Sequence, residues 1–156
     1  MTSTDKTWSR ILKDDGVFPN NPNVPLVIYP GVFQVFLPET IEEILAKNAW
    51  PPAWRYGVYP YHHYHSTAHE FLGCFQGNAR ILFGGDQGHT ADISPGDGVM
   101  IPAGVAHKCL TSSPDFLVVG AYPRGQSPDM KYGRPGERPG VDENIFALGP
   151  PQNILF

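Results

Sequence analysis

Four of the six histidines in this chain lie within the nine residues from His62 to Glu70. Imidazole nitrogens and a carboxylate oxygen together suit a divalent transition metal. Because side chains alternate between the two faces of a strand, His63 and His65 would point to the same side. Glu70 follows after a gap of four residues, which a turn can close. The segment therefore predicts most of a metal site.

A fourth ligand has to come from elsewhere in the chain, and His107 is the candidate. It follows the residues Pro102-Ala103-Gly104-Val105 at the start of an expected strand. His69 competes with Glu70, but the spacing favours Glu70, and we expect His69 beside the ligands or at the surface. His62 has the opposite strand parity and is expected to point outward.

Two spaced patterns resemble the two characteristic motifs of the cupin superfamily. The matching positions are Gly57, His63, His65, Glu70 and Gly77, separated by five, one, four and six residues, and then Gly96, Pro102, Gly104 and His107, separated by five, one and two. The second motif often ends in Asn, where Thr111 stands here. The chain also resembles a branch of small single-domain metal-binding cupins.

The resemblance implies an all-β, cupin-type jelly-roll β-barrel with one metal ion in its mouth. By the roles of the motif positions, His63, His65, Glu70 and His107 would be the four ligands. The metal in such sites is commonly iron, manganese, nickel or zinc.

Three further residues are predicted to be catalytic if residues 55–65 form one unbroken strand. Arg55, Tyr59 and Tyr61 would then share the inward face with the histidines. Arg55 could hold a substrate carboxylate, and either tyrosine could move a proton or donate a hydrogen bond to a metal-bound oxygen. The alternatives are a salt bridge at the barrel rim for Arg55 and simple packing for the tyrosines.

The elements that position these residues follow from 17 glycines and 17 prolines, which separate many short apolar runs. Short strands at even spacing indicate an antiparallel sandwich or small barrel. The expected strands are residues 26–29, 32–36, 55–65, 70–76, 79–83, 90–93, 98–101, 106–111 and 116–122, and one helix is expected over residues 38–49.

A chain of 156 residues is predicted to form a single cupin domain. Residues 1–36 would be an N-terminal arm with edge strands, and residues 54–122 the barrel core with the metal site. The Pro- and Gly-rich residues 123–156 would be an extended arm that docks on the barrel or on a second subunit. Exposed sheet edges need cover, so we expect a homodimer.

Composition excludes several kinds of partner. The net charge is −4 and no cluster of Lys or Arg exceeds a pair, which argues against nucleic acid. No apolar run approaches the ~18 residues of a membrane helix, and the polar N-terminus lacks a signal-peptide pattern, so we expect a cytoplasmic protein. Two cysteines, Cys74 and Cys109, are too few for a disulfide framework and are expected to be reduced and buried.

The predicted function is that of a metal-dependent cupin acting on a small oxygen-bearing organic substrate. We expect a mononuclear-metal dioxygenase that cleaves a chelating substrate such as a β-diketone or an enediol. The alternative is a redox-neutral isomerase, decarboxylase or lyase, in which the metal polarises a carbonyl. A non-catalytic metal- or ligand-binding cupin and a metal-free sugar-nucleotide epimerase are disfavoured, because the chain has no DNA-binding domain and carries all four ligands.

Overall fold

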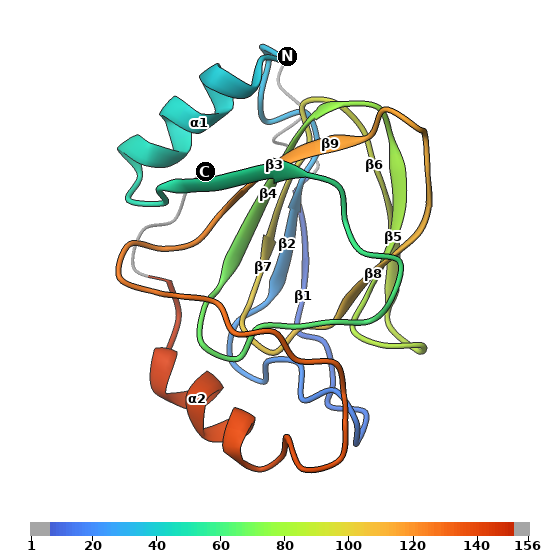
Figure 1. Cartoon of the computed structure of the whole chain (residues 1–156), viewed down its shortest axis with the longest axis vertical. Coiled ribbons are helices and arrows are strands. Elements are labelled where there is room, and N and C mark those ends of the chain that lie inside the picture. Colours follow the sequence, from blue (N-terminus) through green and yellow to red (C-terminus); the bar gives the residue numbers. More distant parts are fainter. Residues whose placement is uncertain (1–6, 152–156) are drawn as a thin grey trace.

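The strands of the chain form two antiparallel sheets in the computed structural model, which describes residues 7–151 (Figure 1). Their bounds are β1 Trp8–Arg10, β2 Leu26–Tyr29, β3 Pro52–Tyr56, β4 Glu70–Gln76, β5 Ala79–Phe83, β6 His89–Ile93, β7 Gly98–Ile101, β8 His107–Ser112 and β9 Leu117–Ala121. The larger sheet has the order β1-β2-β7-β4-β9-β3, and the smaller sheet has the order β6-β5-β8.

This strand order is that of an antiparallel jelly roll. The larger sheet contains the run β3-β9-β4-β7, and the smaller contains β8-β5-β6, with His63 pairing with His107 at the free side of β8. No ladder joins the two sheets into a closed barrel within residues 7–151. The described residues therefore form two antiparallel sheets that are consistent with the expected jelly roll, without closure into a barrel.

The two sheets share a buried apolar core. Leu72 of β4, Val99 of β7 and Val118 of β9 meet Ile81 of β5 in one cluster. Alternate residues of the same strands point to the other face of the larger sheet, as the period of two requires. The core between the two sheets is therefore formed by the side chains on one face of each strand.

Helix α1, Pro38–Lys47, packs on that other face of the larger sheet. It begins at a proline, carries Glu39 in its first turn and ends at a lysine, which suits the helix dipole. Ile41 and Leu45 are fully buried in a cluster with Phe71 of β4. Burial of each of these two side chains stabilises the contact by about 2 kcal/mol.

The expectation of a single helix was wrong, because Gly140–Leu148 forms a second helix, α2. The proline and glycine residues of this region bound the helix instead of interrupting it: Pro139 precedes α2 and Gly149 follows it. Val141 and Ile145 supply its buried face. Within the described residues, neither helix has the length and hydropathy that a membrane span requires.

Two expected strands also differ from the structure. Residues 32–36 form no strand and lead instead from β2 into α1. Residues 55–65 do not form one strand, because the chain leaves the larger sheet after β3 and reaches the smaller sheet at His63. Gly57 and Pro60 stand in the crossing segment, where neither interrupts a ladder.

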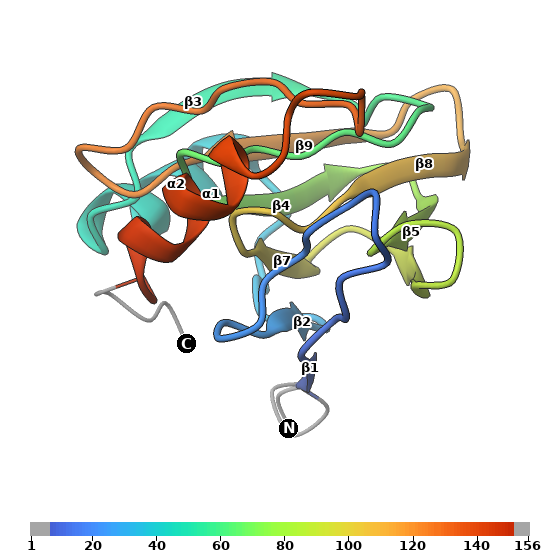
Figure 2. The ribbon, with the colours of Figure 1, turned by 90° about the horizontal axis from the view of Figure 1, so that it is seen from below.

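Both arms dock on the sandwich of their own chain. In Figure 2 the segment after β9 follows the crossing segment, and the two are joined where Tyr64 and Lys131 exchange backbone hydrogen bonds. The N-terminal arm is held by buried Asn20 and Asn21, whose amides donate to the carbonyls of Gly84 and Ala103. The ends of the predicted arms, residues 1–6 and 152–156, lie outside the described residues.

Candidate metal centre

Backbone hydrogen bonds bring the histidines of the two motifs together. The amide of His63 donates to the carbonyl of His107 at 3.2 Å, and the amide of His107 donates back at 2.9 Å. The amide of Gly104 donates to the carbonyl of His65 at 2.8 Å, which fixes the turn before β8. Gly104 has a φ of 92°, and a side chain there would meet the Asn20 carbonyl oxygen at 2.2 Å. The arm and the turn therefore approach so closely that only glycine fits.

The predicted ligands are buried and converge. Glu70 Oε1 lies 3.1 Å from His107 Nε2 and 3.5 Å from His65 Nε2. One ligand atom from each of these three residues lies within 4.8 Å of the others, a grouping that could hold a metal ion. His63 is not part of that group, although its ring centroid is 4.0 Å from that of His107.

The backbone selects the same nitrogen in each histidine. Nδ1 of His63 is 3.0 Å from the Tyr61 carbonyl, Nδ1 of His65 is 2.5 Å from that of Asp129, and Nδ1 of His107 is 3.1 Å from that of Val105. A carbonyl only accepts, so Nδ1 carries the proton in each ring. Nε2 is then left with the lone pair that a metal ion needs.

Glu70 has one oxygen that the protein leaves without a hydrogen bond. Oε2 accepts a hydrogen bond from the hydroxyl of Tyr122 at 3.1 Å, whereas Oε1 is buried and has no donor. With Nε2 unprotonated, neither His65 nor His107 donates to Oε1, and a cation placed between the three groups would be held by all of them. A divalent metal with nitrogen and oxygen ligands fits this donor set.

The charge states of His63 and Glu70 agree with a metal site, whereas that of His65 favours the protonated ring. Burial, followed by the nearby His107, lowers the pKa of His63 to about 3, which keeps its imidazole neutral at pH 7. Burial alone would raise the pKa of Glu70, but His65 and His107 outweigh it and lower that pKa. Glu70 in turn outweighs burial at His65 and raises its pKa. The carboxylate is thus ionised and attracts positive charge.

The ligands open onto a cavity of about 490 Å³. Its walls come from β3 and the crossing segment on one side and from the C-terminal arm on the other. The lining residues are Trp54, Arg55, Tyr56, Gly57, Val58, Tyr59, His63, His65, Glu70, Leu72, His107, Tyr122, Pro128, Asp129 and Met130. A volume of this size suits a small-molecule ligand.

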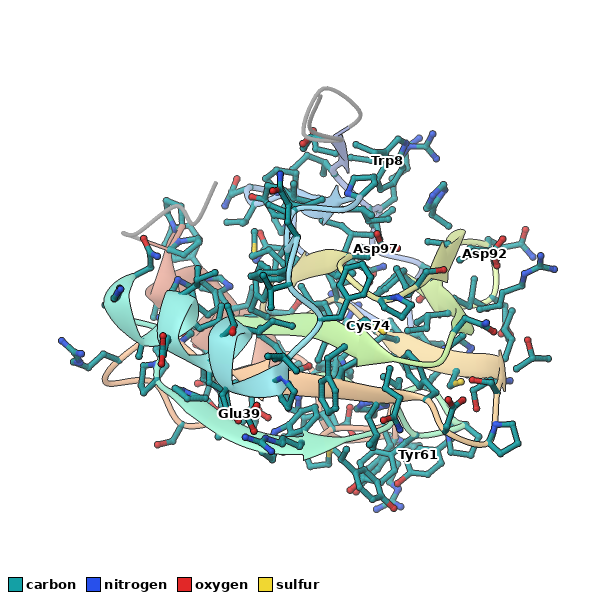
Figure 3. The ribbon with its side chains drawn as sticks, turned by 90° about the horizontal axis from the view of Figure 1, so that it is seen from above. Trp8, Glu39, Tyr61, Cys74, Asp92 and Asp97 are labelled. Atoms are coloured by element: carbon teal, nitrogen blue, oxygen red, sulfur yellow. The ribbon has the colours of Figure 1, made fainter. Side chains whose placement is uncertain are left out.

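Arg55, the predicted substrate anchor, directs its guanidinium to α1. Its Nε and Nη2 atoms each lie 2.8 Å from an oxygen of Glu42, and Nη2 lies 3.4 Å from Glu39 Oε2. Glu39 projects from α1 toward β3 in Figure 3. Because the chain leaves the larger sheet after β3, Arg55 and His63 do not belong to one strand, and the alternation of side chains does not place them on the same face. The guanidinium that was expected to bind substrate is therefore engaged in a salt bridge, which was the alternative expected for Arg55.

Tyr59 lines the cavity, and Tyr61 packs against it. Their rings stack at 5.1 Å with an interplanar angle of 13°, and each meets His63 edge-on, at 5.3 and 5.9 Å. They are 39% and 43% exposed, and Tyr61 lies at the edge of the molecule in Figure 3.

The remaining histidines near the ligands have other partners. His69 is fully buried; its Nδ1 accepts from the amide of Ala103 at 2.9 Å, and its Nε2 donates to the Gly149 carbonyl at 2.8 Å. Both of its ring nitrogens are therefore engaged in holding the fold. His62 Nε2 lies 2.7 Å from Asp86 Oδ1, also away from the ligand group.

The two cysteines are unpaired and buried in the core between the sheets. Cys74, on β4, lies near the centre of the molecule in Figure 3. Burial raises the pKa of its thiol to about 11, so it stays protonated at pH 7. Neither Cys74 nor Cys109 lines the cavity.

Two residues at the site were missed from the sequence. Tyr122 reaches Glu70 and also accepts a hydrogen bond from Trp54 Nε1 at 2.9 Å. Its parity with the buried Val118 could have placed it inward. Asp129, whose carbonyl orients His65, had no local signal because it lies in the irregular C-terminal arm.

The structure thus combines two antiparallel sheets with a buried His65, Glu70 and His107 group that could hold a metal ion. The chain belongs to the family of the uncharacterized protein YjlB of Bacillus subtilis (strain 168), with 45% identity over 150 residues, which cover 95% of this chain and 88% of that protein. No family model matches the chain.

Two solved structures are similar to parts of it. One is the DMSP lyase DddQ from Ruegeria pomeroyi DSS-3, with a TM-score of 0.42 and 19% identity over 72% of this chain and 43% of that one. The other is a DUF861 family protein from Thermotoga maritima, with a TM-score of 0.35 and 25% identity over 53% of this chain and 88% of that one.

Proposed function

We propose that the protein is a metal-dependent cupin enzyme that holds one divalent metal ion with His63, His65, Glu70 and His107. The observation that carries the proposal is the buried Oε1 atom of Glu70, which lacks a donor and faces two Nε2 lone pairs. Iron, manganese, nickel and zinc all suit nitrogen and carboxylate ligands.

The residues around the ligands prepare the site for a small organic molecule. Three neutral histidines and one carboxylate leave a divalent ion with a net charge of about +1, which attracts substrate oxygens. When bound, the metal would polarise these oxygens and, if it is redox-active, activate dioxygen. The walls of the cavity are largely apolar, and the Tyr122 hydroxyl donates a hydrogen bond to Glu70.

We propose a mononuclear-metal dioxygenase as the reaction class, acting on a chelating substrate such as a β-diketone or an enediol. Apart from the ligands and tyrosines, the ionisable groups of the lining are Arg55 and Asp129. Arg55 is bound to Glu42, and the Asp129 carboxylate accepts hydrogen bonds from the amides of Ser66 and Thr67. Few groups are therefore free to shuttle protons, which favours oxidative cleavage.

A redox-neutral isomerase, decarboxylase or lyase is the second candidate, and Tyr122 is the observation that favours it. Its hydroxyl lines the cavity beside Glu70, where it could move a proton to or from a substrate held at the metal. Burial, and then the charge of Glu70, raises the pKa of Tyr122, so it would act as a proton donor at neutral pH.

The ligand assignment is tested by metal analysis of protein purified without added metal. We expect about one equivalent of a transition metal in the wild type, and its loss in His65→Ala and His107→Ala because each variant removes a buried nitrogen donor. His89→Ala is the matched control, since His89 stacks on Trp8 at 3.9 Å outside the site. Unchanged metal content in His65→Ala or His107→Ala would contradict the proposal.

The reaction class is tested by anaerobic reconstitution with Fe(II) and an oxygen electrode. We expect oxygen uptake with small β-diketones or enediols, and none with the His107→Ala variant. Turnover with zinc or nickel, together with no oxygen uptake with iron, would select the redox-neutral candidate instead. Absence of turnover with every metal would argue for a protein that only binds.

A further inference from the structure

The cavity walls above the metal ligands are aromatic and aliphatic. Trp54, Tyr56, Tyr59 and Tyr122 supply the rings, and Val58, Leu72 and Met130 supply the remaining apolar surface. Apolar walls around a few polar groups are typical of small-molecule sites in which the polar groups fix orientation. Here those polar groups are the metal ligands at one end.

Tyr59 is held in place before any ligand arrives. Its ring stacks on Tyr61 and meets the edge of His63, and the ring of Tyr56 lies 6.3 Å away. Its carbonyl accepts the amide of Cys109 at 2.9 Å, which ties the segment to β8. A fixed ring beside the cavity offers an aromatic surface with little loss of side-chain entropy on binding.

The lining carries no cation that is available to a second acidic group on a ligand. Among the described lining residues the one basic side chain besides the ligand histidines is Arg55, which pairs with Glu42. Asp129 adds a carboxylate, which accepts hydrogen bonds from Ser66 and Thr67. A carboxylate or phosphate far from the metal would therefore meet no free cation in the lining.

We propose that the substrate carries its metal-binding oxygens on an uncharged planar ring, and that Tyr56 and Tyr59 hold this ring at the cavity wall. The part of this proposal in which substrate oxygens bind the metal rests on the proposed function. The part in which tyrosines hold the ring rests on the aromatic wall alone. The volume of about 490 Å³ accommodates one or two fused rings. Stacking on a tyrosine contributes about 1 kcal/mol beyond the area that is buried.

Calorimetric titration of the full chain, stripped of metal by a chelator, tests the ring site without the metal. The probes are 2-naphthol, which is neutral at pH 7.5, and 2-naphthoate, which has the same rings and a negative charge. We expect 2-naphthol to bind at least about tenfold more tightly, because the wall offers the carboxylate no cation. Equal affinity for the two probes, or no binding of 2-naphthol, would overturn the inference.

Variants of the exposed tyrosines locate the bound ring. We expect Tyr59→Ala to weaken 2-naphthol binding about tenfold and Tyr59→Phe to retain it, since the ring face and not the hydroxyl makes the contact. Phe146→Ala, at an aromatic residue that is 80% exposed and outside the lining, is the matched control. An unaltered affinity in Tyr59→Ala would overturn the assignment.

The two proposals fail in different ways. If His65→Ala and His107→Ala retain metal, the metal centre is wrong, whatever the ring probe shows. If the wild type binds metal but the metal-free protein does not bind 2-naphthol, the metal centre is supported and the ring site is refuted.

Discussion

At the scale of single residues, three backbone carbonyls decide what the centre can bind. The carbonyls of Tyr61, Val105 and Asp129 accept hydrogen bonds from Nδ1 of the three histidines, and Nε2 of His65 and His107 faces Glu70. Backbone acceptors do not titrate, so the tautomers stay fixed over the whole range of neutral imidazole. The arrangement keeps the ligand atoms in place before a metal enters.

Tyr122 is the side chain that orients the carboxylate, and it leads to a prediction. Tyr122→Phe removes the donor to Glu70 Oε2 and the acceptor of Trp54 Nε1. We expect the metal still to bind, with an affinity lower by about tenfold or more, because partners that orient a ligand contribute that much. Competition with a fluorescent chelator measures this affinity.

Tyr132→Phe is the control for this prediction, because Tyr132 lies outside the cavity lining. The same metal affinity in Tyr122→Phe and the wild type would show that Glu70 needs no help from Tyr122. Wild-type turnover by metal-saturated Tyr122→Phe would also remove the proton-transfer role of the second candidate function.

At the scale of elements, Arg138 joins the two arms. Its guanidinium lies 2.7 and 2.5 Å from the oxygens of Asp14 in the N-terminal arm, and 3.0 and 2.6 Å from those of Asp142 in α2. A guanidinium that contacts both oxygens of a carboxylate makes the strongest form of ion pair, and Arg138 does so with both aspartates. Asp14 is about half exposed, with 49% of its side-chain surface accessible, so screening by solvent limits the contribution.

This clamp predicts a pH dependence. The hydrogen bond to Arg138 outweighs burial and lowers the pKa of Asp14 below its usual value. A carboxyl whose pKa is lowered on folding stabilises the fold above its unfolded pKa, and this contribution is lost as the pH falls through the folded value. We therefore expect Arg138→Ala to reduce stability by up to about 1 kcal/mol at pH 7 and by much less near pH 2.

Urea unfolding of the wild type and of Arg138→Ala at both pH values measures the difference. Arg80→Ala is the matched control, because Arg80 pairs with Asp92 within the smaller sheet and holds no arm. An Arg138→Ala effect that is as large at pH 2 as at pH 7 would assign the loss to packing instead of charge.

The sequence predicted those elements whose patterns are local. The motif resemblance implied His63, His65, Glu70 and His107 as ligands, and the structure groups the last three and leaves His63 outside the group. The alternation of side chains along β9 could also have predicted the inward position of Tyr122. The positions of Asp129 and helix α2 could not be predicted in this way, because they depend on a long irregular arm that docks on a distant segment.

At the scale of the whole molecule, apolar surface remains uncovered beside α1. Val35, Phe36 and Leu37 follow one another and are 48%, 54% and 55% exposed. The outer strands β1 and β3 also leave the edges of the larger sheet without a partner strand within the described residues. Adjacent exposed apolar side chains and open edges are features that association covers.

We therefore predict a homodimer that buries the Val35–Leu37 surface. Light scattering at micromolar concentration should give twice the chain mass of 17.2 kDa for the wild type. Phe36→Asp should give the monomer mass, because a charge in an apolar interface is desolvated without a partner. Phe146→Asp, on α2 at a residue that is 80% exposed, is the control and should leave the mass unchanged. A monomeric wild type would refute the dimer, whereas a dimer that survives Phe36→Asp would move the interface to another surface, with the sheet edges as the next to test.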